Sequence, residues 1–461
     1  MAEIRPFRAI RYAGAWGADI SSRIAPPYDV LSEQDKAAML AADPRNIVAA
    51  DLPHTPPKSA GPAAAYQRSA DLLTKWLADG SLVRESAPAV FAYRQVFEVN
   101  GVQRARRGFI ARVRAEQFRA SPAGIFPHEQ TFSGPKEDRL MLMRATRMQL
   151  SPIFGLFADD SGELTDSLYA NLPASPMLVG SLGPVRHEAW PVTAPDRIEA
   201  LADAMRDRPI FIADGHHRYT TALNYLAELE SAGPLPPDHP ARFVMFVCVS
   251  MHDPGLAILP THRVVSVRCA EPAALVGQLA ARLGQGNAFR VQAGTWSAEQ
   301  LESLVLERGC GWFGVKAATG DNALLLHLAD ANLLDRYEPT RGVAFRRLDV
   351  AVLHRFLIDE VLKSVAGDPA GIEYPHNGRD VAAALEQKAL DSASAFGTGA
   401  DVAGKAHGPQ SVGISKIAFL LAPTPLSAVR DVCLSGELMP QKSTFFYPKL
   451  ATGLALNDLA E

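Results

Sequence analysis

Apolar residues recur at helical spacing in several stretches of the chain. One such stretch covers residues 63–82 and ends at Asp79-Gly80, which is a helix stop signal. The same periodicity predicts a series of further helices. These cover residues 140–150, 195–206, 271–284, 297–307, 348–365 and 379–388.

Other apolar runs are short and β-prone, which predicts strands. The runs 90–99 and 107–113 lie on either side of Asn100-Gly101, a favoured hairpin dipeptide. The stretch after Asp160 is rich in small residues and predicts loops, as does 391–412, which we interpret as a loop or flexible flap. Further strands are expected at 47–52, 152–158, 209–213, 243–251, 312–316, 323–328 and 417–422.

The strand expected at 209–213 leads directly into a helix. Asp214-Gly215 breaks the strand, and apolar residues from Tyr219 onward then recur at steps of three and four. Gly233-Pro234 ends the helix, and the next buried strand covers 243–251. A strand, a helix and a strand in this order predict an α/β layer, whether or not the two strands pair in parallel.

The length of 461 residues exceeds what one hydrophobic core usually supports, so two domains are expected. We expect an N-terminal α/β domain over 1–185, which contains a polar loop at 126–139. A second α/β domain over 186–461 would carry the Asp-Gly-His-His-Arg segment and a helix-rich C-terminal part. The expected fold class is therefore α/β with a mixed sheet.

Charge and cysteine usage narrow the classes of function. The net charge of −4 gives no sign of a nucleic-acid-binding face, so no nucleic-acid partner is expected. No stretch of about 18 uncharged apolar residues appears, which argues against a membrane span. The four cysteines are isolated, without CxxC spacing, which is typical of a reducing cytoplasm.

The segment around Asp214 has the groups that phosphate chemistry requires. A strand that ends in Asp-Gly and opens into a helix places the carboxylate beside unpaired N–H groups, which favour anions. Gly215 allows a ligand to approach the backbone, and Arg218 can bind phosphate through two bonds. The alternative interpretation is that Asp214 only caps the helix.

Three further polar segments are candidates for the same site. The loop 126–139 contains His128 and Glu129 but lacks the second histidine of a metalloprotease motif. His262-Arg263 follows the strand at 243–251, and the block 439–449 combines lysines, hydroxyls and aromatic residues. Each of these segments is equally consistent with a solvated turn or surface strand. The chain has no GxxxxGK[ST], GxGxxG or GxSxG motif, which disfavours P-loop, nicotinamide and serine-hydrolase chemistry.

Seven segments of the chain together resemble one family. They are Pro26-Pro27-Tyr28-Asp29-Val30, Arg45-Asn46-Ile47-Val48, His128-Glu129-Gln130-Thr131, Pro135-Lys136-Glu137-Asp138-Arg139, Ala213-Asp214-Gly215-His216-His217-Arg218-Tyr219, Leu259-Pro260-Thr261-His262-Arg263 and 439–449. The family is a large bacterial group of uncharacterised proteins, domain of unknown function 1015. The resemblance spans nearly the whole chain, but the family's name implies no activity.

A shorter resemblance points to an activity. Residues 214–218 are similar to the Asp-Gly-His-Thr-Arg motif of the free-serine kinases, which have a ParB/sulfiredoxin-like fold. This resemblance implies such a core with large helical and loop elaborations. It also implies a kinase that phosphorylates the hydroxyl of free L-serine or another small metabolite, with ATP or ADP and Mg²⁺.

The same resemblance assigns roles to residues of this chain. It implies that Asp214, Glu129 and His216 are catalytic, with Asp214 acting as a base or at the metal and Asp29 as the reserve candidate for the second acid. His217 stands where the motif has threonine, which leaves its own role open. The residues of this motif expected to bind nucleotide are Gly215, His217 and Arg218, with His216 also at the phosphate. The three polar segments described above add Lys136, Arg139, His262, Arg263 and Lys442 to the residues expected to bind nucleotide.

Two other classes of function stay open on the sequence. The first is a ParB-like regulator that binds nucleotide without phosphorylating a small molecule. The second is a metal-dependent hydrolase with Asp214, His216, His217 and His262 as ligands. Adjacent histidines on a helix point about 100° apart, which makes the second class the less favoured of the two.

Overall fold

The chain forms two compact units. The computed structural model describes residues 2–14, 16–55, 59–131, 133–269, 274–387 and 414–460. Unit 1 comprises Met1–Ala257 and Phe446–Glu461, and unit 2 comprises Ile258–Phe445. The expected boundary between 185 and 186 lies within unit 1, just after the turn of a hairpin. The flap expected at 391–412 lies outside the described residues.

Unit 1 is built on one large mixed sheet, so the expected α/β class with a mixed sheet is confirmed. Its strand order is β3-β10-β11-β5-β6-β13-β9-β12-β7, and β1 also pairs with β6. The bounds are β1 (Ile4–Arg5), β3 (Ala18–Asp19), β5 (Val90–Val99), β6 (Val102–Arg114), β7 (Ile125–Phe126), β9 (Ile153–Phe157), β10 (Leu178–Leu182), β11 (Val185–Val192), β12 (Ile210–Asp214) and β13 (Phe243–Ser250).

The two strands on either side of the Asp-Gly-His-His-Arg helix are not neighbours in this sheet. β9 lies between them, and it pairs in parallel with β13 and antiparallel with β12. β5 and β6 form the expected hairpin at Asn100-Gly101. Most of β12 and all of β13 are buried, because the sheet is covered where these strands lie.

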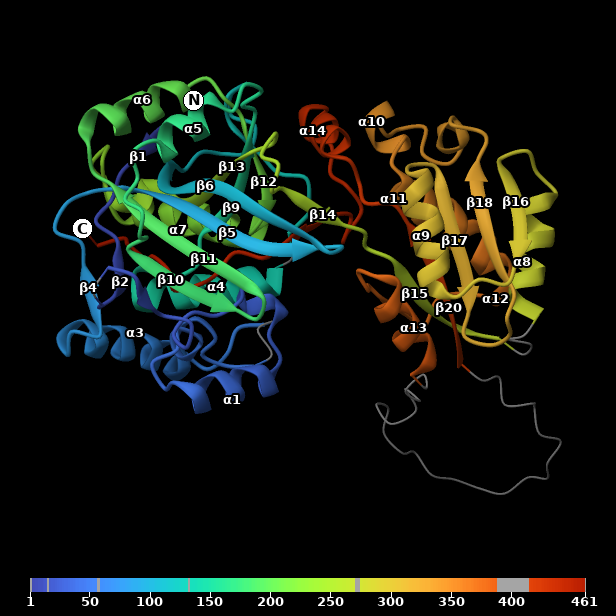
Figure 1. Cartoon of the computed structure of the whole chain (residues 1–461), viewed down its shortest axis with the longest axis horizontal. Helices are drawn as coiled ribbons and strands as arrows, with labels where there is room; N and C mark the ends of the chain where they lie inside the picture. Colours follow the sequence, from blue (N-terminus) through green and yellow to red (C-terminus); the bar gives the residue numbers. More distant parts are fainter. Residues whose placement is uncertain are drawn as a thin grey trace. The chain divides into compact units, whose positions relative to one another are not determined.

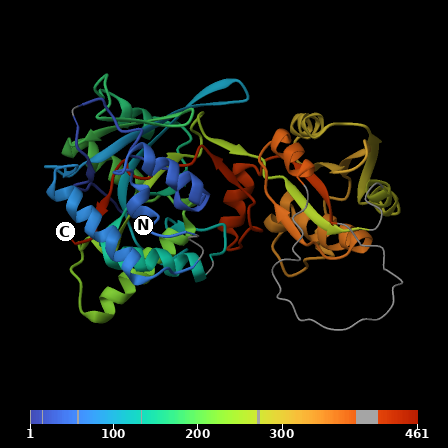
Figure 2. The same cartoon turned by 90° about the horizontal axis from the view of Figure 1, so that it is seen from below.

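Helices pack beside this sheet in unit 1. α7 (His216–Ala232) contacts β9, and α4 (Ser133–Thr146) packs against both α7 and α3 (Ala63–Ala78). In the view of Figure 1, α5 (Glu163–Tyr169) and α6 (Pro195–Met205) lie at the top of unit 1. α1 (Glu33–Ala42) and α3 lie at the bottom of that view and face the viewer in Figure 2.

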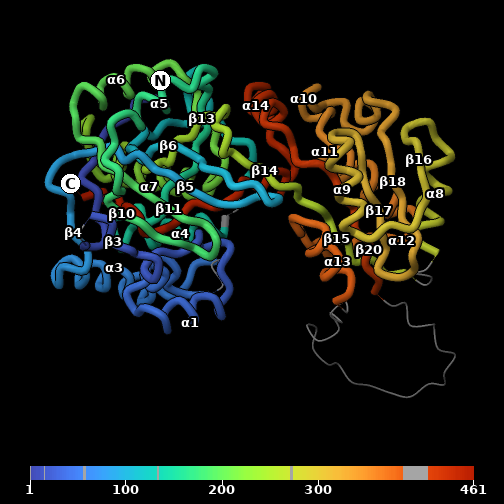
Figure 3. Tube along the Cα trace, in the orientation of Figure 1, coloured from blue at the N-terminus to red at the C-terminus, as the bar shows by residue number. Residues whose placement is uncertain are grey.

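The C-terminal segment belongs to unit 1, although the residues directly before it, Ile258–Phe445, belong to unit 2. β14 (Ala257–Leu259) and β21 (Phe445–Tyr447) carry the chain out of unit 1 and back. The red trace of Figure 3 shows the last residues running through unit 1. There β22 (Asn457–Asp458) pairs with β8 (Met148–Gln149), and β2 (Ile10–Tyr12) pairs with β4 (Leu82–Arg84).

Unit 2 has its own six-stranded antiparallel sheet, in the order β16-β18-β17-β20-β15-β19. The strands are β15 (Arg263–Arg268), β16 (Phe289–Gly294), β17 (Trp312–Ala317), β18 (Ala323–Leu328), β19 (Gly371–Glu373) and β20 (Ile414–Leu421). The helices are α8 (Leu275–Gly284), α9 (Ala298–Arg308), α10 (Val343–Arg346), α11 (Asp349–Val352), the π-helix η5 (Leu353–Leu362), α12 (Lys363–Ala366), α13 (Gly378–Glu386) and α14 (Leu426–Leu434).

Three expectations from the sequence are wrong. The second half of the polar loop expected at 126–139 lies in α4, which begins at Ser133. The strand expected at 47–52 is the short helix α2 (Val48–Asp51), because the side chain of Asn46 accepts a hydrogen bond from the Val48 amide and starts a turn. The loop-rich region expected after Asp160 contains α5, β10 and β11 as well as turns. Among the described helices, none is long and apolar enough to cross a membrane.

Candidate functional site

Asp214 ends β12 and forms ion pairs with two cations. Lys449 Nζ lies 2.9 Å from Asp214 Oδ1, and Arg218 Nη2 lies 2.9 Å from Asp214 Oδ2. Arg218 reaches the carboxylate because it lies four residues further on, about one turn into α7. Arg218 also donates to the carbonyl of Pro152 in the segment that leads into β9.

The charge of Asp214 is fixed by these neighbours. Burial would raise the pKa of the carboxyl group, but Lys449 and Arg218 outweigh burial and hold the pKa well below its usual range. The side chain is therefore an ionised carboxylate at neutral pH. Each of its two oxygens has one cationic partner, so a ligand that draws one of the cations away would leave the carboxylate freer to act as a base or a metal ligand.

The turn after Asp214 requires glycine for two reasons. Gly215 has a φ of +94°, in the left-handed region, and a Cβ there would lie 3.0 Å from Arg218 Nη2. The Arg218 guanidinium thus packs over the glycine backbone. Among the described residues, no side chain caps the 17-residue helix α7 at Gly215, so its first turn keeps the partial positive charge of a helix N-terminus.

His128 and His216 form a buried pair beside this turn. Their rings pack edge to face with centroids 4.6 Å apart, and His216 Nε2 accepts a hydrogen bond from the His128 backbone amide at 3.2 Å. Burial lowers the pKa of His128 to about 4. Burial and then the neighbouring His128 lower the pKa of His216 well below its usual value. Both rings are therefore neutral at neutral pH.

This hydrogen bond fixes the tautomer of His216. Because Nε2 is an acceptor, the ring proton of the neutral form lies on Nδ1. Nδ1 lies 3.8 Å from Oε2 of Glu129, whose side chain is partly exposed. The Nε2 atom of His216 is thus occupied, and its Nδ1 lies near Glu129 at a separation longer than a hydrogen bond.

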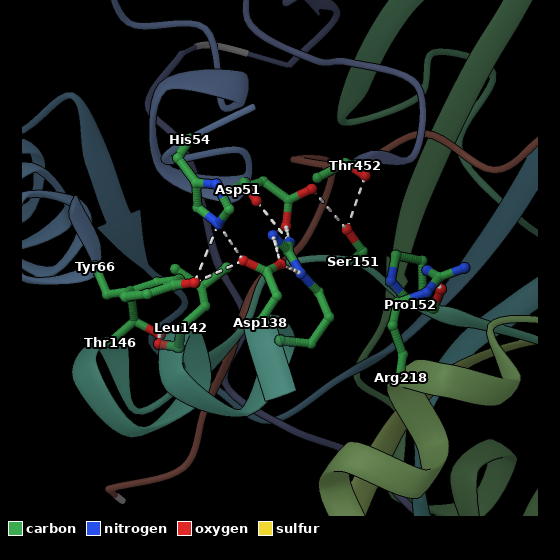
Figure 4. A network of polar contacts seen from close by, with 11 residues as sticks. Asp51, His54, Tyr66, Asp138, Leu142, Thr146, Ser151, Pro152, Arg218 and Thr452 are labelled. Carbon is green, nitrogen blue, oxygen red and sulfur yellow. Dashed lines mark hydrogen bonds and ion pairs between the residues drawn. The ribbon is translucent and has the colours of Figure 1, made fainter. Parts of the chain in front are cut away.

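A second ionic cluster lies in unit 1, and we call it the sealed cluster because the charged side chains at its centre, Asp138 and Arg139, are buried. Asp138 Oδ1 accepts hydrogen bonds from Tyr66 at 2.7 Å and contacts His54 Nε2 at 2.6 Å, while Asp138 Oδ2 accepts from Arg139 Nε at 2.7 Å. Arg139 Nη1 donates to the Asp51 carbonyl at 2.6 Å. Figure 4 shows these contacts, with Asp51, His54, Tyr66 and Asp138 from different segments pointing toward one another.

The sealed cluster joins segments that are far apart in sequence. Burial lowers the pKa of Arg139, but Asp51 and Asp138 outweigh this effect and raise it overall. Tyr28 packs over the Arg139 guanidinium at 4.1 Å, so the Pro26-to-Val30 segment joins the cluster. Burial raises the pKa of Asp51.

A small cavity lies between the sealed cluster and Arg218. Its volume is about 40 Å³, enough for a water molecule. Its polar lining includes Asp51, Arg139, Ser151 and Arg218, and the apolar lining consists of Leu142, Met143, Met148, Leu150, Ile153 and Val244. Figure 4 shows Ser151 and Pro152 adjacent in the chain, between the two ionic groups.

The structure brings together many of the predicted residues in unit 1. The 214–218 segment lies beside Glu129, and Arg139 shares the cavity with Arg218. Lys136 lies in the first turn of α4, where its carbonyl accepts a hydrogen bond from Thr221. The reserve acid Asp29 is exposed beside Tyr28.

Three predicted residues belong to unit 2 and make their contacts there. His262 Nε2 lies 3.1 Å from Glu302 Oε1, and Arg263 donates to the carbonyl of Lys442 at 3.0 Å. Their role in binding nucleotide stays a prediction. No three histidine, cysteine or acidic side chains in the described part of the chain gather in a way that would hold a metal ion.

Four residues of the two clusters are absent from the site expected from the sequence, which are Lys449, Asp51, His54 and Tyr66, and Asp138 is expected only as part of the segment 135–139. Lys449 lies within the block 439–449, where the residue expected at the site is Lys442. The partner of Lys449, Asp214, is 235 positions away, and no local pattern links the two. Only the block's basic and aromatic composition pointed to this segment.

Comparison with known proteins identifies one family. The family described as "Protein of unknown function (DUF1015)" matches residues 4–351. No protein of curated function matches the chain.

Solved structures show low similarity to the chain. A free serine kinase variant in complex with ADP is 14% identical with a TM-score of 0.30, and the match covers 72% of this chain and 89% of that one. SbnI with a C-terminal truncation, from Staphylococcus aureus, is 12% identical with a TM-score of 0.31 and coverages of 76% and 87%. A conserved hypothetical protein from Pyrococcus furiosus is 14% identical with a TM-score of 0.29 and coverages of 72% and 90%.

Proposed function

The chain belongs to the DUF1015 family, and we propose that it is a nucleotide-dependent kinase that phosphorylates the hydroxyl group of a small metabolite. Free L-serine is the first acceptor to test, because of the similarity of residues 214–218 to the serine-kinase motif. The observation that carries the proposal is the pairing of Lys449 and Arg218 on Asp214 at the start of α7. Phosphoryl transfer depends on positioned cations and a helix N-terminus rather than on covalent chemistry by the protein.

The two cations are suited to phosphate. Arg218 and Lys449 are partly exposed, and both are held by one carboxylate. A phosphate group arriving at the turn competes with Asp214 for them, and charge-assisted bonds to phosphate are strong enough for such an exchange. The N-terminus of α7, which begins after Gly215, adds its partial positive charge for the same group.

Mg²⁺ fits this arrangement when phosphate engages the cations. Such ions are typically held by one or two carboxylates together with nucleotide phosphates. Asp214 and Glu129 are the carboxylates that would hold the ion, which would neutralise charge on the transferred group. Both oxygens of Asp214 form ion pairs with these cations, so the metal would replace at least part of this pairing.

Glu129 is the residue that would take the proton of the acceptor hydroxyl. His216 is a poor base in this arrangement, because its Nε2 accepts from the His128 amide and its Nδ1 carries the proton. His216 Nδ1 faces Glu129, which is partly exposed. In this proposal His216 orients Glu129, and Glu129 meets the acceptor.

The test is a turnover assay with the full chain, Mg²⁺, ATP or ADP, and a panel of hydroxyl amino acids, with products identified by mass spectrometry. We expect phosphoserine from the natural chain and from Asp196→Asn, a matched control at an exposed aspartate of α6. Asp214→Asn should slow turnover at least about 100-fold, because the cations lose the group that positions them. An Asp214→Asn variant as fast as the natural chain contradicts the assignment. Nucleotide binding without any phosphorylated product would favour the ParB-like regulator.

A further inference from the structure

The C-terminal segment that delivers Lys449 is held by a buried pair of side chains on the sheet. Gln95 in β5 and Arg106 in β6 lie opposite each other in the hairpin register. Arg106 Nη1 donates to the Tyr447 carbonyl at 3.1 Å and Nη2 to the Pro448 carbonyl at 2.5 Å. Gln95 Nε2 donates to the Lys449 carbonyl at 3.0 Å. Two side chains thus bind three successive carbonyls.

The two side chains also bind each other. Arg106 Nε donates to Gln95 Oε1 at 3.0 Å, and the Arg106 guanidinium packs over the ring of Phe154 at 4.7 Å. Phe446, the residue before the bound carbonyls, is buried and packs on Phe154 at 5.6 Å. The backbone of residues 446–449 is therefore fixed from the sheet side before the Lys449 side chain begins.

Burying the charged side chain of Arg106 costs desolvation free energy, so we asked what the buried guanidinium does in the fold. The side chain is 1% exposed, and its hydrogen-bond acceptors are uncharged oxygens. Burial accordingly lowers the pKa of Arg106 to about 10. A buried guanidinium without a hydrogen-bonded carboxylate is an expensive way to stabilise a fold, whereas its planar set of donors is suited to fixing several carbonyls at once.

We propose that Gln95 and Arg106 form a clamp on the carbonyls of residues 447–449, and that this clamp positions Lys449 as a phosphate-binding cation of the Asp214 site. Gln95 and Arg106 are positioning residues, since they act through Lys449. The phosphate role rests on the proposed function, but the positioning of Lys449 against Asp214 does not. A lysine side chain is long and flexible, so a fixed backbone is what keeps its ammonium group 2.9 Å from Asp214.

The clamp is tested first by lysine reactivity, which does not depend on any activity. The full chain is treated with an acetylating reagent, and the labelling rate of each lysine is measured by peptide mass spectrometry. In Gln95→Met/Arg106→Met we expect Lys449 to be labelled several-fold faster than in the natural chain, while the half-buried Lys36 of unit 1 keeps its rate. Arg104→Met, on the same strand, is the matched control and should leave Lys449 unchanged.

Two outcomes overturn the clamp. One is an unchanged Lys449 rate in the double variant with Lys36 also unchanged. If both Lys449 and Lys36 are labelled faster, the double variant has loosened unit 1 as a whole, and a milder variant is needed. Arg106→Lys serves this purpose, because it keeps a positive charge but loses the planar set of guanidinium donors that binds the carbonyls. A Lys449 rate above that of the natural chain in Arg106→Lys supports the clamp, and an equal rate overturns it.

The phosphate role is tested separately by calorimetric titration with ADP. Lys449→Met should weaken binding about 10-fold or more, because a charge-assisted contact is lost. The clamp variant should weaken it to a similar extent, and the triple variant no further than Lys449→Met alone, because residues that act through one another are not additive. If the clamp variant binds ADP as tightly as the natural chain while Lys449→Met binds it more weakly, then Gln95 and Arg106 do not position Lys449 for phosphate. If the natural chain does not bind ADP, both the phosphate-binding role of Lys449 and the proposed function are wrong. The lysine-labelling experiment still shows in that case whether Gln95 and Arg106 position Lys449.

Discussion

Two ionic clusters in unit 1 combine aspartate with arginine, but they differ in their access to solvent. In the Asp214 cluster the side chains of Asp214, Arg218 and Lys449 are 17%, 11% and 20% exposed. In the sealed cluster Asp138 is 0% and Arg139 is 5% exposed. Aspartate and arginine are therefore accessible to solvent in one cluster and buried in the other. We propose that the Asp214 cluster, here called the open cluster, exchanges partners with a ligand and that the sealed cluster holds its segments together.

The energetic consequence of this difference is large. A buried charge that loses its partner keeps the cost of desolvation, whereas a charge near the surface recovers water. The sealed cluster also binds backbone, since Arg139 donates to the Asp51 carbonyl and so ties α4 to α2. We therefore expect changes in the sealed cluster to affect stability and changes in the open cluster to affect binding.

Substitution of Arg139 should give the largest effect on stability. Arg139→Leu leaves Asp138 and Asp51 buried without their cation, so the free energy of unfolding should fall by about 3–5 kcal/mol. Arg144→Leu is the matched control on the same helix, because its pair with Glu228 is 50% and 40% exposed. That change should cost less than about 1 kcal/mol. Urea unfolding followed by circular dichroism measures both.

The opposite result would redefine the sealed cluster. If Arg139→Leu unfolds like the natural chain but binds ADP less tightly, Arg139 belongs to the nucleotide site, as the sequence predicted. The two clusters would then be one site, joined through the cavity that Arg139 and Arg218 share.

The two clusters also differ in how well the sequence predicts them. The strand–turn–helix around Asp214 is local, so the β-prone run, the Asp-Gly break and the helical spacing identify it without knowledge of the fold. Arg139 was predicted to bind nucleotide because it lies in a polar loop-like block. Its burial depends on Asp51, 88 positions away, which no local pattern reveals.

Long-range pairing explains most of the remaining differences, and one of them has a local cause. The helix at 63–78 and the hairpin at Asn100-Gly101 were predicted because their signals are local. The insertion of β9 between β12 and β13, and the return of Lys449 to Asp214, depend on tertiary packing. The strand expected at 47–52 failed because the side chain of Asn46 competes locally for the backbone.

Acid should destabilise the protein through the buried histidines beside the open cluster. The pKa of His128 is about 4 in the folded chain, below the ordinary value of 6.5, so the unfolded chain binds the proton more readily. Stability from this group is present above pH 6.5 and is lost as the pH falls from 6.5 toward 4. Between pH 7 and pH 5 this group alone should cost about 2 kcal/mol.

The variant His128→Phe tests this assignment. It keeps a ring against His216 and removes the titrating group, so its unfolding free energy should fall less between pH 7 and pH 5. The measurement is urea unfolding at the two pH values. A variant whose pH dependence equals that of the natural chain would show that the proton is taken up elsewhere.

The smallest effect is expected from a pair of glycine substitutions. Gly215→Ala forces alanine into a φ of +94° and against Arg218, which should cost about 1–2 kcal/mol of stability. Gly277→Ala, within α8, meets no atom within 4 Å and should stabilise the protein by about 0.5–1 kcal/mol. Thermal unfolding of the two variants therefore gives shifts of opposite sign. If Gly215→Ala were as stable as the natural chain, the turn would have to relax and release Arg218 from the glycine backbone. Its ADP affinity would then show whether the open cluster needs the close contact between Arg218 and this turn.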